Sequence, residues 1–216
     1  MRKLSRVFAT LVVLFVVTPL LAQTSPEWDA LMQGNRAFQG GYLNRDLAKR
    51  LPIADGQAPP VAVLSCSDSR VPPEVVFNRP IAQMFVVRTA GNVTETYATA
   101  SLEYAVAVLS TKMIVVMGHE SCGAIHSALT PKDDGALTPF LKELVLEIRK
   151  SFGGIPEDQW DARNHTIVRR ATHDHARRVA RQLLTDSALL REREGKTLEI
   201  VSAYYNLETG VVELVP

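Results

Sequence analysis

Three short, unbroken apolar runs constrain the fold of this chain more than any other feature of its sequence. They cover residues 61–64, 84–87 and 113–117. Runs of this length and composition are typical of strands that are buried on both faces of a parallel sheet. Residues 94–109, between the second and third runs, are rich in alanine and have a helical pattern. The order strand, helix, strand predicts a crossover connection and therefore an α/β fold.

Further helices and a hairpin are expected around this sheet. An N-terminal helix should begin after Ser25 and end at Gly40, and residues 140–152 and 166–190 also have helical patterns. Residues 198–214 have the pattern of two strands joined by a glycine-containing turn. The predicted fold is thus a mainly parallel β-sheet flanked by helices, with an N-terminal helical arm and a C-terminal antiparallel hairpin at one edge.

The only two cysteines of the chain follow two of the predicted strands. Cys66 lies just after the first apolar run, and His119 and Cys122 follow the third. Open α/β sheets place their ligands at the carboxyl ends of strands, so these side chains are expected to converge. Two cysteines and one histidine are a ligand set with which a catalytic zinc keeps its fourth position open. The pattern predicts a zinc centre and an enzyme.

Two alternatives for the cysteines remain. In an oxidising compartment Cys66 and Cys122 could form a disulfide. The histidine three residues before Cys122 and the position of Cys66 at a strand end favour metal ligation instead. A thiol redox protein is disfavoured because the chain has no Cys-x-x-Cys spacing.

Residues 1–22 have the pattern of a secretory signal peptide. Basic residues precede the apolar run 7–17, and Ala22 ends a suitable cleavage site. The run is short for a membrane span, so an uncleaved anchor is the weaker alternative. Cleavage would leave residues 23–216 as one domain in the periplasm or outside the cell, with no stable membrane insertion.

The charge balance argues against nucleic acid as a partner. The full chain has 24 Lys and Arg and 23 Asp and Glu. Removing residues 1–22 takes away three basic residues and no acidic ones, which leaves 21 against 23 and a net charge of −2. A near-neutral chain lacks the basic surface that nucleic-acid binding needs.

The sequence resembles the β-class carbonic anhydrases in five motifs that occur in the family's order. The two zinc motifs are matched by Cys-Ser-Asp-Ser-Arg-Val at 66–71 and Gly-His-Glu-Ser-Cys-Gly-Ala at 118–124. Residues 34–38 resemble the first-helix motif, residues 85–92 the second strand and its turn, and residues 204–210 the terminal hairpin. The resemblance covers nearly the whole chain after the signal segment.

One departure from the family pattern is Thr89, where the family commonly has Asn. The resemblance implies an enzyme, a zinc lyase, that hydrates CO2 reversibly to bicarbonate and a proton by attack of zinc-bound hydroxide. It implies that Cys66, His119 and Cys122 hold Zn²⁺, with water or the Asp68 carboxylate in the fourth place. Because two thiolates cancel the formal charge of Zn²⁺, the water should be only moderately acidified and activity should rise toward alkaline pH.

Whether water or the Asp68 carboxylate is the fourth ligand depends on how Asp68 interacts with Arg70. Arg70 is close enough in sequence for a bidentate guanidinium–carboxylate pair, which would keep Asp68 off the metal and let it accept the nucleophile's proton. The alternative is a solvated surface pair of little energetic value. Some bacterial relatives carry Trp three residues before the first cysteine ligand, as part of an inhibitory bicarbonate pocket. Here that residue is Val63, so the open form is expected.

Four further residues are predicted to bind substrate. The resemblance places Gln57, Phe85 and Tyr104 in the pocket for CO2 and bicarbonate, and the N–H of Gly123 is a candidate oxyanion donor at a helix start. In the family the Gln and Tyr come from the neighbouring subunit, so a homodimer, or a tetramer of two dimers, is implied. For Phe85 and Tyr104 ordinary core packing is the alternative.

Two other functions compete with CO2 hydration. Hydrolysis of carbon disulfide or carbonyl sulfide would use the same site and the same nucleophile. A non-catalytic zinc protein would use Asp68 as a fourth ligand, but a structural site has no need of Arg70, which draws Asp68 away.

Overall fold

The computed structural model describes residues 24–43 and 53–216, which form a single five-stranded sheet with the order β2-β1-β3-β4-β5. The predicted signal peptide, residues 1–22, lies outside the described residues. The first four strands of the sheet run parallel, and β5 pairs antiparallel with β4 at one edge. The predicted fold class is confirmed. The strands are β1 (Val61–Cys66), β2 (Met84–Thr89), β3 (Met113–His119), β4 (Glu199–Tyr205) and β5 (Val212–Leu214).

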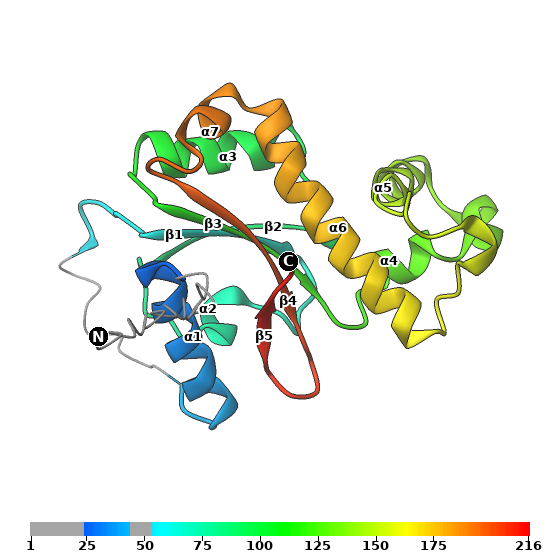
Figure 1. Ribbon diagram of the computed structural model, residues 1–216, viewed down its shortest axis with the longest axis horizontal. Coiled ribbons are helices and arrows are strands. Elements are labelled where there is room, and N and C mark those ends of the chain that lie inside the picture. Colours follow the sequence, from blue (N-terminus) through cyan, green and yellow to red (C-terminus); the bar gives the residue numbers. More distant parts are fainter. Residues whose placement is uncertain (1–23, 44–52) are drawn as a thin grey trace, which may run out of the picture.

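Helices cover both faces of this sheet (Figure 1), with α3 and α7 on one side and α1 and α2 on the other. None of the helices within the described ranges combines the length and apolar character that a bilayer crossing requires. Three short 3-10 segments connect longer elements: η2 (Ala90–Asn92), η3 (Pro131–Ala136) and η4 (Glu157–Gln159). The α-helices are α1 (Pro26–Gln39), α2 (Pro73–Val76), α3 (Thr96–Ala107), α4 (Gly123–Ala128), α5 (Pro139–Arg149), α6 (His165–Asp186) and α7 (Ala188–Arg193).

Side-chain caps explain where several helices begin. Ser25 accepts a hydrogen bond from the N–H of Trp28 at the start of α1, and Thr138 caps α5 in the same way. Both helices have Pro at their first position, where a missing N–H costs nothing. The helical pattern over residues 166–190 becomes two helices, because Ser187 ends α6 and its hydroxyl caps α7.

The central strands are buried on both faces, which is why their sequences are unbroken apolar runs. Val61 and Val63 of β1 belong to a core that includes residues of α1, α4 and α5. Ala62 and Leu64 point to the opposite face, into a second core with residues of α3, α6 and α7. Both faces of β1 are therefore packed inside the protein.

The N-terminal arm is held to the sheet domain by the buried side chain of Asn35. Its Nδ2 donates to the carbonyl oxygens of Val76, at 2.9 Å, and Gly210, at 2.8 Å. Its Oδ1 accepts from the N–H of Val212 at 3.1 Å. One turn of α1 is thereby joined to both α2 and the C-terminal hairpin.

Gly34, beside Asn35, allows this close approach. A Cβ atom at Gly34 would lie 1.9 Å from the carbonyl oxygen of Phe77. We expect Gly34→Ala to lower the free energy of unfolding by about 2 kcal/mol or more, because backbone has to move to accept the methyl group. Thermal unfolding followed by circular dichroism measures the effect.

Gly153→Ala is the matched control, because a Cβ atom there meets nothing within 4 Å in the described part of the chain. Equal melting temperatures for the two variants would contradict this account of α1 packing.

Candidate metal centre

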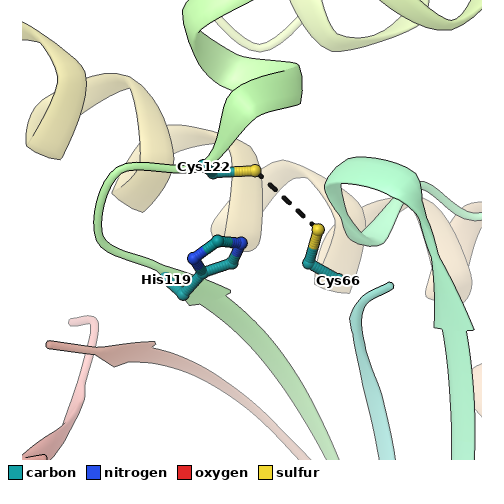
Figure 2. Close-up of side chains that lie close together, drawn as sticks. All are labelled: Cys66, His119 and Cys122. Atoms are coloured by element: carbon teal, nitrogen blue, oxygen red, sulfur yellow. Dashed lines mark hydrogen bonds between the residues drawn. The ribbon is translucent and has the colours of Figure 1, made fainter. Parts of the chain in front are cut away.

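Cys66, His119 and Cys122 meet at the carboxyl edge of the sheet. Cys66 is the last residue of β1, His119 is the last residue of the neighbouring strand β3, and Cys122 lies just before α4. The two strands thus extend slightly further than the sequence pattern predicted. The three ligand atoms lie within 4.8 Å of one another, and all three side chains are buried. Figure 2 shows them pointing toward a common centre.

The hydrogen bonding of His119 leaves one ring nitrogen available to a metal. Its Nδ1 lies 2.8 Å from the carbonyl oxygen of Glu120, which can only accept, so Nδ1 carries the proton. Its Nε2 therefore holds a lone pair, is buried, and has no hydrogen-bond partner among the described residues. A histidine oriented by a backbone carbonyl through one nitrogen is typical of metal ligands.

The two sulfur atoms also have the separation that a metal requires. They lie 3.9 Å apart (Figure 2), and both cysteines are free. Two thiolates at the usual zinc distance in a tetrahedral site are separated by about 3.8 Å, whereas a disulfide needs about 2 Å. Zinc therefore fits these residues without movement of either sulfur, and the arrangement favours a metal over a disulfide.

One proton is shared unequally between the two thiols. The hydrogen bond with Cys122 lowers the pKa of Cys66 against the effect of burial, and the side chain of His119 and the backbone N–H groups of Asp68 and Gly91 lower it further. The same sulfur–sulfur hydrogen bond, followed by burial, raises the pKa of Cys122. A divalent cation that binds both as thiolates would release the remaining proton.

The structure brings Asp68 and Arg70 together in the bidentate pair that the sequence predicted. Arg70 Nε lies 2.9 Å from Asp68 Oδ1, and Arg70 Nη2 lies 2.7 Å from Oδ2. These hydrogen bonds hold the pKa of Asp68 well below its usual range. Arg70 Nη2 also donates to the carbonyl oxygen of Ser121, and Asp68 Oδ2 lies 4.0 Å from His119 Nε2. The carboxylate is thus ionised and held beside the candidate metal centre.

Arg88 is a further residue of the site, and sequence reasoning missed it. Its Nε donates to the carbonyl oxygen of Cys66 at 3.0 Å, and its Nη2 donates to that of Asp68 at 2.5 Å. The guanidinium therefore fixes the backbone that carries both functional side chains. An arginine in an otherwise apolar strand was the one sequence signal that pointed to this role.

Gly123 lies beside an apolar pocket. It is the first residue of α4, and a Cβ atom there would meet nothing within 4 Å among the described residues. The pocket has a volume of about 240 Å³, and Ala124, Leu137 and Leu144 are among the side chains that line it. A small apolar molecule could approach the N–H of Gly123 through this space.

The other predicted substrate residues are not brought to the metal centre within one chain. Phe85 and Tyr104 pack against each other, with ring centroids 6.3 Å apart. Phe85 belongs to the core on the α3 face, whereas Cys66 and Cys122 belong to the core on the opposite face. Gln57 is exposed in the segment before β1. A single chain therefore supplies the metal ligands and the Asp68 pair but not the complete predicted pocket.

Known proteins resemble this chain in sequence over most of its length. The sequence model of the family described as carbonic anhydrase matches residues 61–212. Carbonic anhydrase 2 of Mycobacterium tuberculosis is 35% identical over 187 residues, which cover 85% of this chain and 88% of that protein. The carbonic anhydrase of Mycolicibacterium smegmatis is 33% identical over 197 residues, which cover 87% of this chain and 91% of that protein.

Solved structures show the same fold. A tetrameric β-carbonic anhydrase of the ascomycete Sordaria macrospora superposes with a TM-score of 0.70 at 25% identity, over 87% of this chain and 96% of that one. The β-carbonic anhydrase of Coccomyxa gives a TM-score of 0.70 at 23% identity, over 88% of this chain and 87% of that one. The resemblance inferred from the motifs is confirmed, and the chain belongs to the carbonic anhydrase family, in its β class.

Proposed function

We propose that this protein hydrates CO2 reversibly to bicarbonate and a proton, with one Zn²⁺ held by Cys66, His119 and Cys122. The observation that carries the proposal is the unpartnered Nε2 of His119 facing two sulfurs 3.9 Å apart. Zinc in such a site supplies a Lewis acid that lowers the pKa of a water molecule, so that a nucleophile is present near neutral pH.

Asp68 orients the nucleophile. Its carboxylate stays ionised because Arg70 lowers its pKa, so at working pH it can only accept a hydrogen bond. A water or hydroxide that donates to Asp68 directs its lone pair elsewhere, toward the carbon of CO2. Both oxygens of Asp68 are already bound by Arg70, which argues against the carboxylate serving as a fourth metal ligand in a closed structural site.

In this proposal, the substrate is held by residues near the Asp68–Arg70 pair. The apolar pocket beside Gly123 suits CO2, which has no net dipole, and the N–H of Gly123 can donate to an oxygen that gains negative charge. We propose that Gln57, Phe85 and Tyr104 of a second copy complete the site in a homodimer, which can pair further into a tetramer. The exposed Tyr97, Tyr104 and Val108 on the α3 segment give that face an apolar surface that a partner would cover.

We also propose that the enzyme is exported to the periplasm or the cell exterior, with residues 1–22 removed. The proposal rests on the sequence pattern of that segment alone. Mass spectrometry of the N-terminus after expression in a cell with a secretion pathway would test the cleavage after Ala22.

Metal content tests the proposed ligands. We expect one zinc per wild-type chain, and substoichiometric zinc in Cys66→Ser and His119→Ala, because each substitution removes one of only three protein ligands. Elemental analysis after dialysis measures this. His165→Ala is the control, since His165 is an exposed histidine outside the cluster. Full zinc occupancy in both ligand variants would refute the site.

Stopped-flow CO2 hydration across pH tests the role of Asp68. The wild-type rate should rise from neutral toward alkaline pH, as two thiolates leave the water weakly acidified. Asp68→Asn should lower kcat/KM about 100-fold or more while zinc stays bound, because the acceptor and its charge are lost. A wild type with full zinc and no hydration at any pH would overturn the proposed function.

Asp161→Asn is the matched control for this test. Asp161 also accepts hydrogen bonds from the backbone N–H and the guanidinium of the arginine two residues later, Arg163, but this pair is not part of the metal centre. Hydration by Asp161→Asn should equal that of the wild type. An equal loss in both variants would mean that such pairs act on folding rather than on the site.

Subunit complementation tests the shared site. Cys66→Ser lacks a metal ligand and Tyr104→Ala lacks the proposed partner residue, and each alone should have reduced activity. A mixed dimer would contain one site with intact Cys66 from one chain and intact Tyr104 from the other. Co-expression at equal amounts should therefore restore about one quarter of wild-type activity. Activity no higher than the average of the two separate variants would contradict a shared pocket.

A further inference from the structure

A chain of hydrogen bonds runs from the end of α5 through the middle of α6 to the sulfur of Cys66. The hydroxyl of Ser151 lies 2.7 Å from His175 Nδ1, and His175 Nε2 lies 2.7 Å from the carbonyl oxygen of Gly91. The N–H of Gly91 in turn donates to Cys66 Sγ at 3.3 Å. Residues far apart in the sequence are thus linked to one candidate metal ligand.

The partners of His175 determine its protonation. The Gly91 carbonyl can only accept, so Nε2 carries the proton and Nδ1 accepts from the Ser151 hydroxyl. The side chain is 1% exposed, and burial lowers its pKa to about 4. Of the three charged groups that act on it, Arg178 and Glu147 are paired with each other at 2.7 Å, and the third is Cys66. The imidazole is therefore neutral at physiological pH, with both nitrogens satisfied and one fixed tautomer.

The backbone of Gly91 is in the left-handed region, with φ of 63° and ψ of 22°, which glycine adopts without strain. A Cβ atom at this position would lie 2.9 Å from Ile148 Cδ1 and 3.0 Å from Ala124 Cβ. Glycine rotates more freely about φ and ψ than other residues, so a hydrogen bond to its carbonyl oxygen restricts the direction of its N–H. The contact from His175 supplies that constraint.

We propose that His175 is a positioning residue for Cys66: by holding the Gly91 carbonyl, it keeps the Gly91 N–H directed at the sulfur. This inference rests on the proposed metal site. An N–H donor stabilises a thiolate and withdraws negative charge from it. A thiolate that donates less charge leaves the metal more acidic, which partly offsets the effect of having two sulfur ligands.

Cobalt(II) in place of zinc gives a readout that does not depend on activity. Thiolate-to-cobalt charge-transfer bands report the charge density on sulfur. His175→Leu, which keeps apolar volume but removes the donor, should move the band to longer wavelength and lower zinc affinity about tenfold or more. His175→Gln, whose amide N–H can reach the position of Nε2, should restore the wild-type band. Ser187→Ala, which removes a buried hydroxyl at the start of α7, is the control for lost stability.

The pH profile of CO2 hydration provides a second readout. Its midpoint should rise by about half to one pH unit in His175→Leu and return to the wild-type value in His175→Gln, since one neutral hydrogen bond is lost and regained. If His175→Leu does not fold, Ser151→Ala tests the same chain of hydrogen bonds. Its band should shift in the same direction, because Nδ1 of His175 loses its donor and the ring is held less firmly toward Gly91.

The outcomes separate this inference from the proposed function. A wild type with no thiolate-to-cobalt band would overturn the metal site and this inference together. A normal wild-type band that is unchanged in His175→Leu, or in Ser151→Ala where the first variant does not fold, would overturn the positioning role alone. A band that shifts equally in Ser187→Ala would also overturn it, since general destabilisation would then explain the change.

Discussion

The parallel pairing of β1 with β3 is the constraint on which the metal centre depends. Val61 pairs with Met113 and Ser65 with Met117, so the two strands run in step and end at the same edge of the sheet. The flanking strands β2 and β4 bind the residues that follow Cys66 and His119. The N–H of Ser67 donates to the carbonyl of Thr89, and the N–H of Glu120 donates to that of Tyr205. The loops that follow Cys66 and His119 are therefore still bound to the neighbouring strands. These two candidate ligands are part of the sheet, and Cys122 follows three residues after His119, at the start of α4.

Two arginines stabilise this edge in different ways. Arg88 donates to main-chain carbonyls and fixes the path of the loop, whereas Arg70 donates to the Asp68 carboxylate and fixes a side chain. Ionised groups at a buried site are costly unless they are paired and hydrogen-bonded. Arg70 favours the anionic form of Asp68, and hydrogen bonds from Cys122 and from backbone N–H groups favour that of Cys66, before any cation binds.

The sequence allowed the fold class, the helix starts and the metal ligands to be predicted because each depends on local or periodic signals. Unbroken apolar runs identified β1, β2 and β3, and the capping residue Ser25 located the start of α1. The hydrogen-bond partners of Arg88 and His175 could not be predicted from such signals. They join segments 20 to 84 residues apart, and which strand or helix lies opposite them is decided only by tertiary packing.

The position of Phe85 illustrates a second limit. In a strand that carries apolar residues on both faces, alternation does not reveal which face a given side chain occupies. Phe85 and Val86 are equally apolar, yet Val86 packs against the core that contains Cys66 and Phe85 against the other. The motif correctly indicated the family, but only the sheet itself shows that Phe85 and the metal ligands of one chain lie on opposite faces.

The hydrogen bonds of Asn35 have a consequence for the order in which the chain can fold. Two of its three main-chain partners, Gly210 and Val212, lie 175 and 177 residues later in the chain. Helix α1 can form early, but its polar contacts with the body of the protein are completed only when the C-terminal hairpin is in place. Contacts of such long sequence separation slow folding and leave intermediates exposed for longer. Helix α1 is thus synthesised well before the residues of the hairpin that bind its Asn35 side chain.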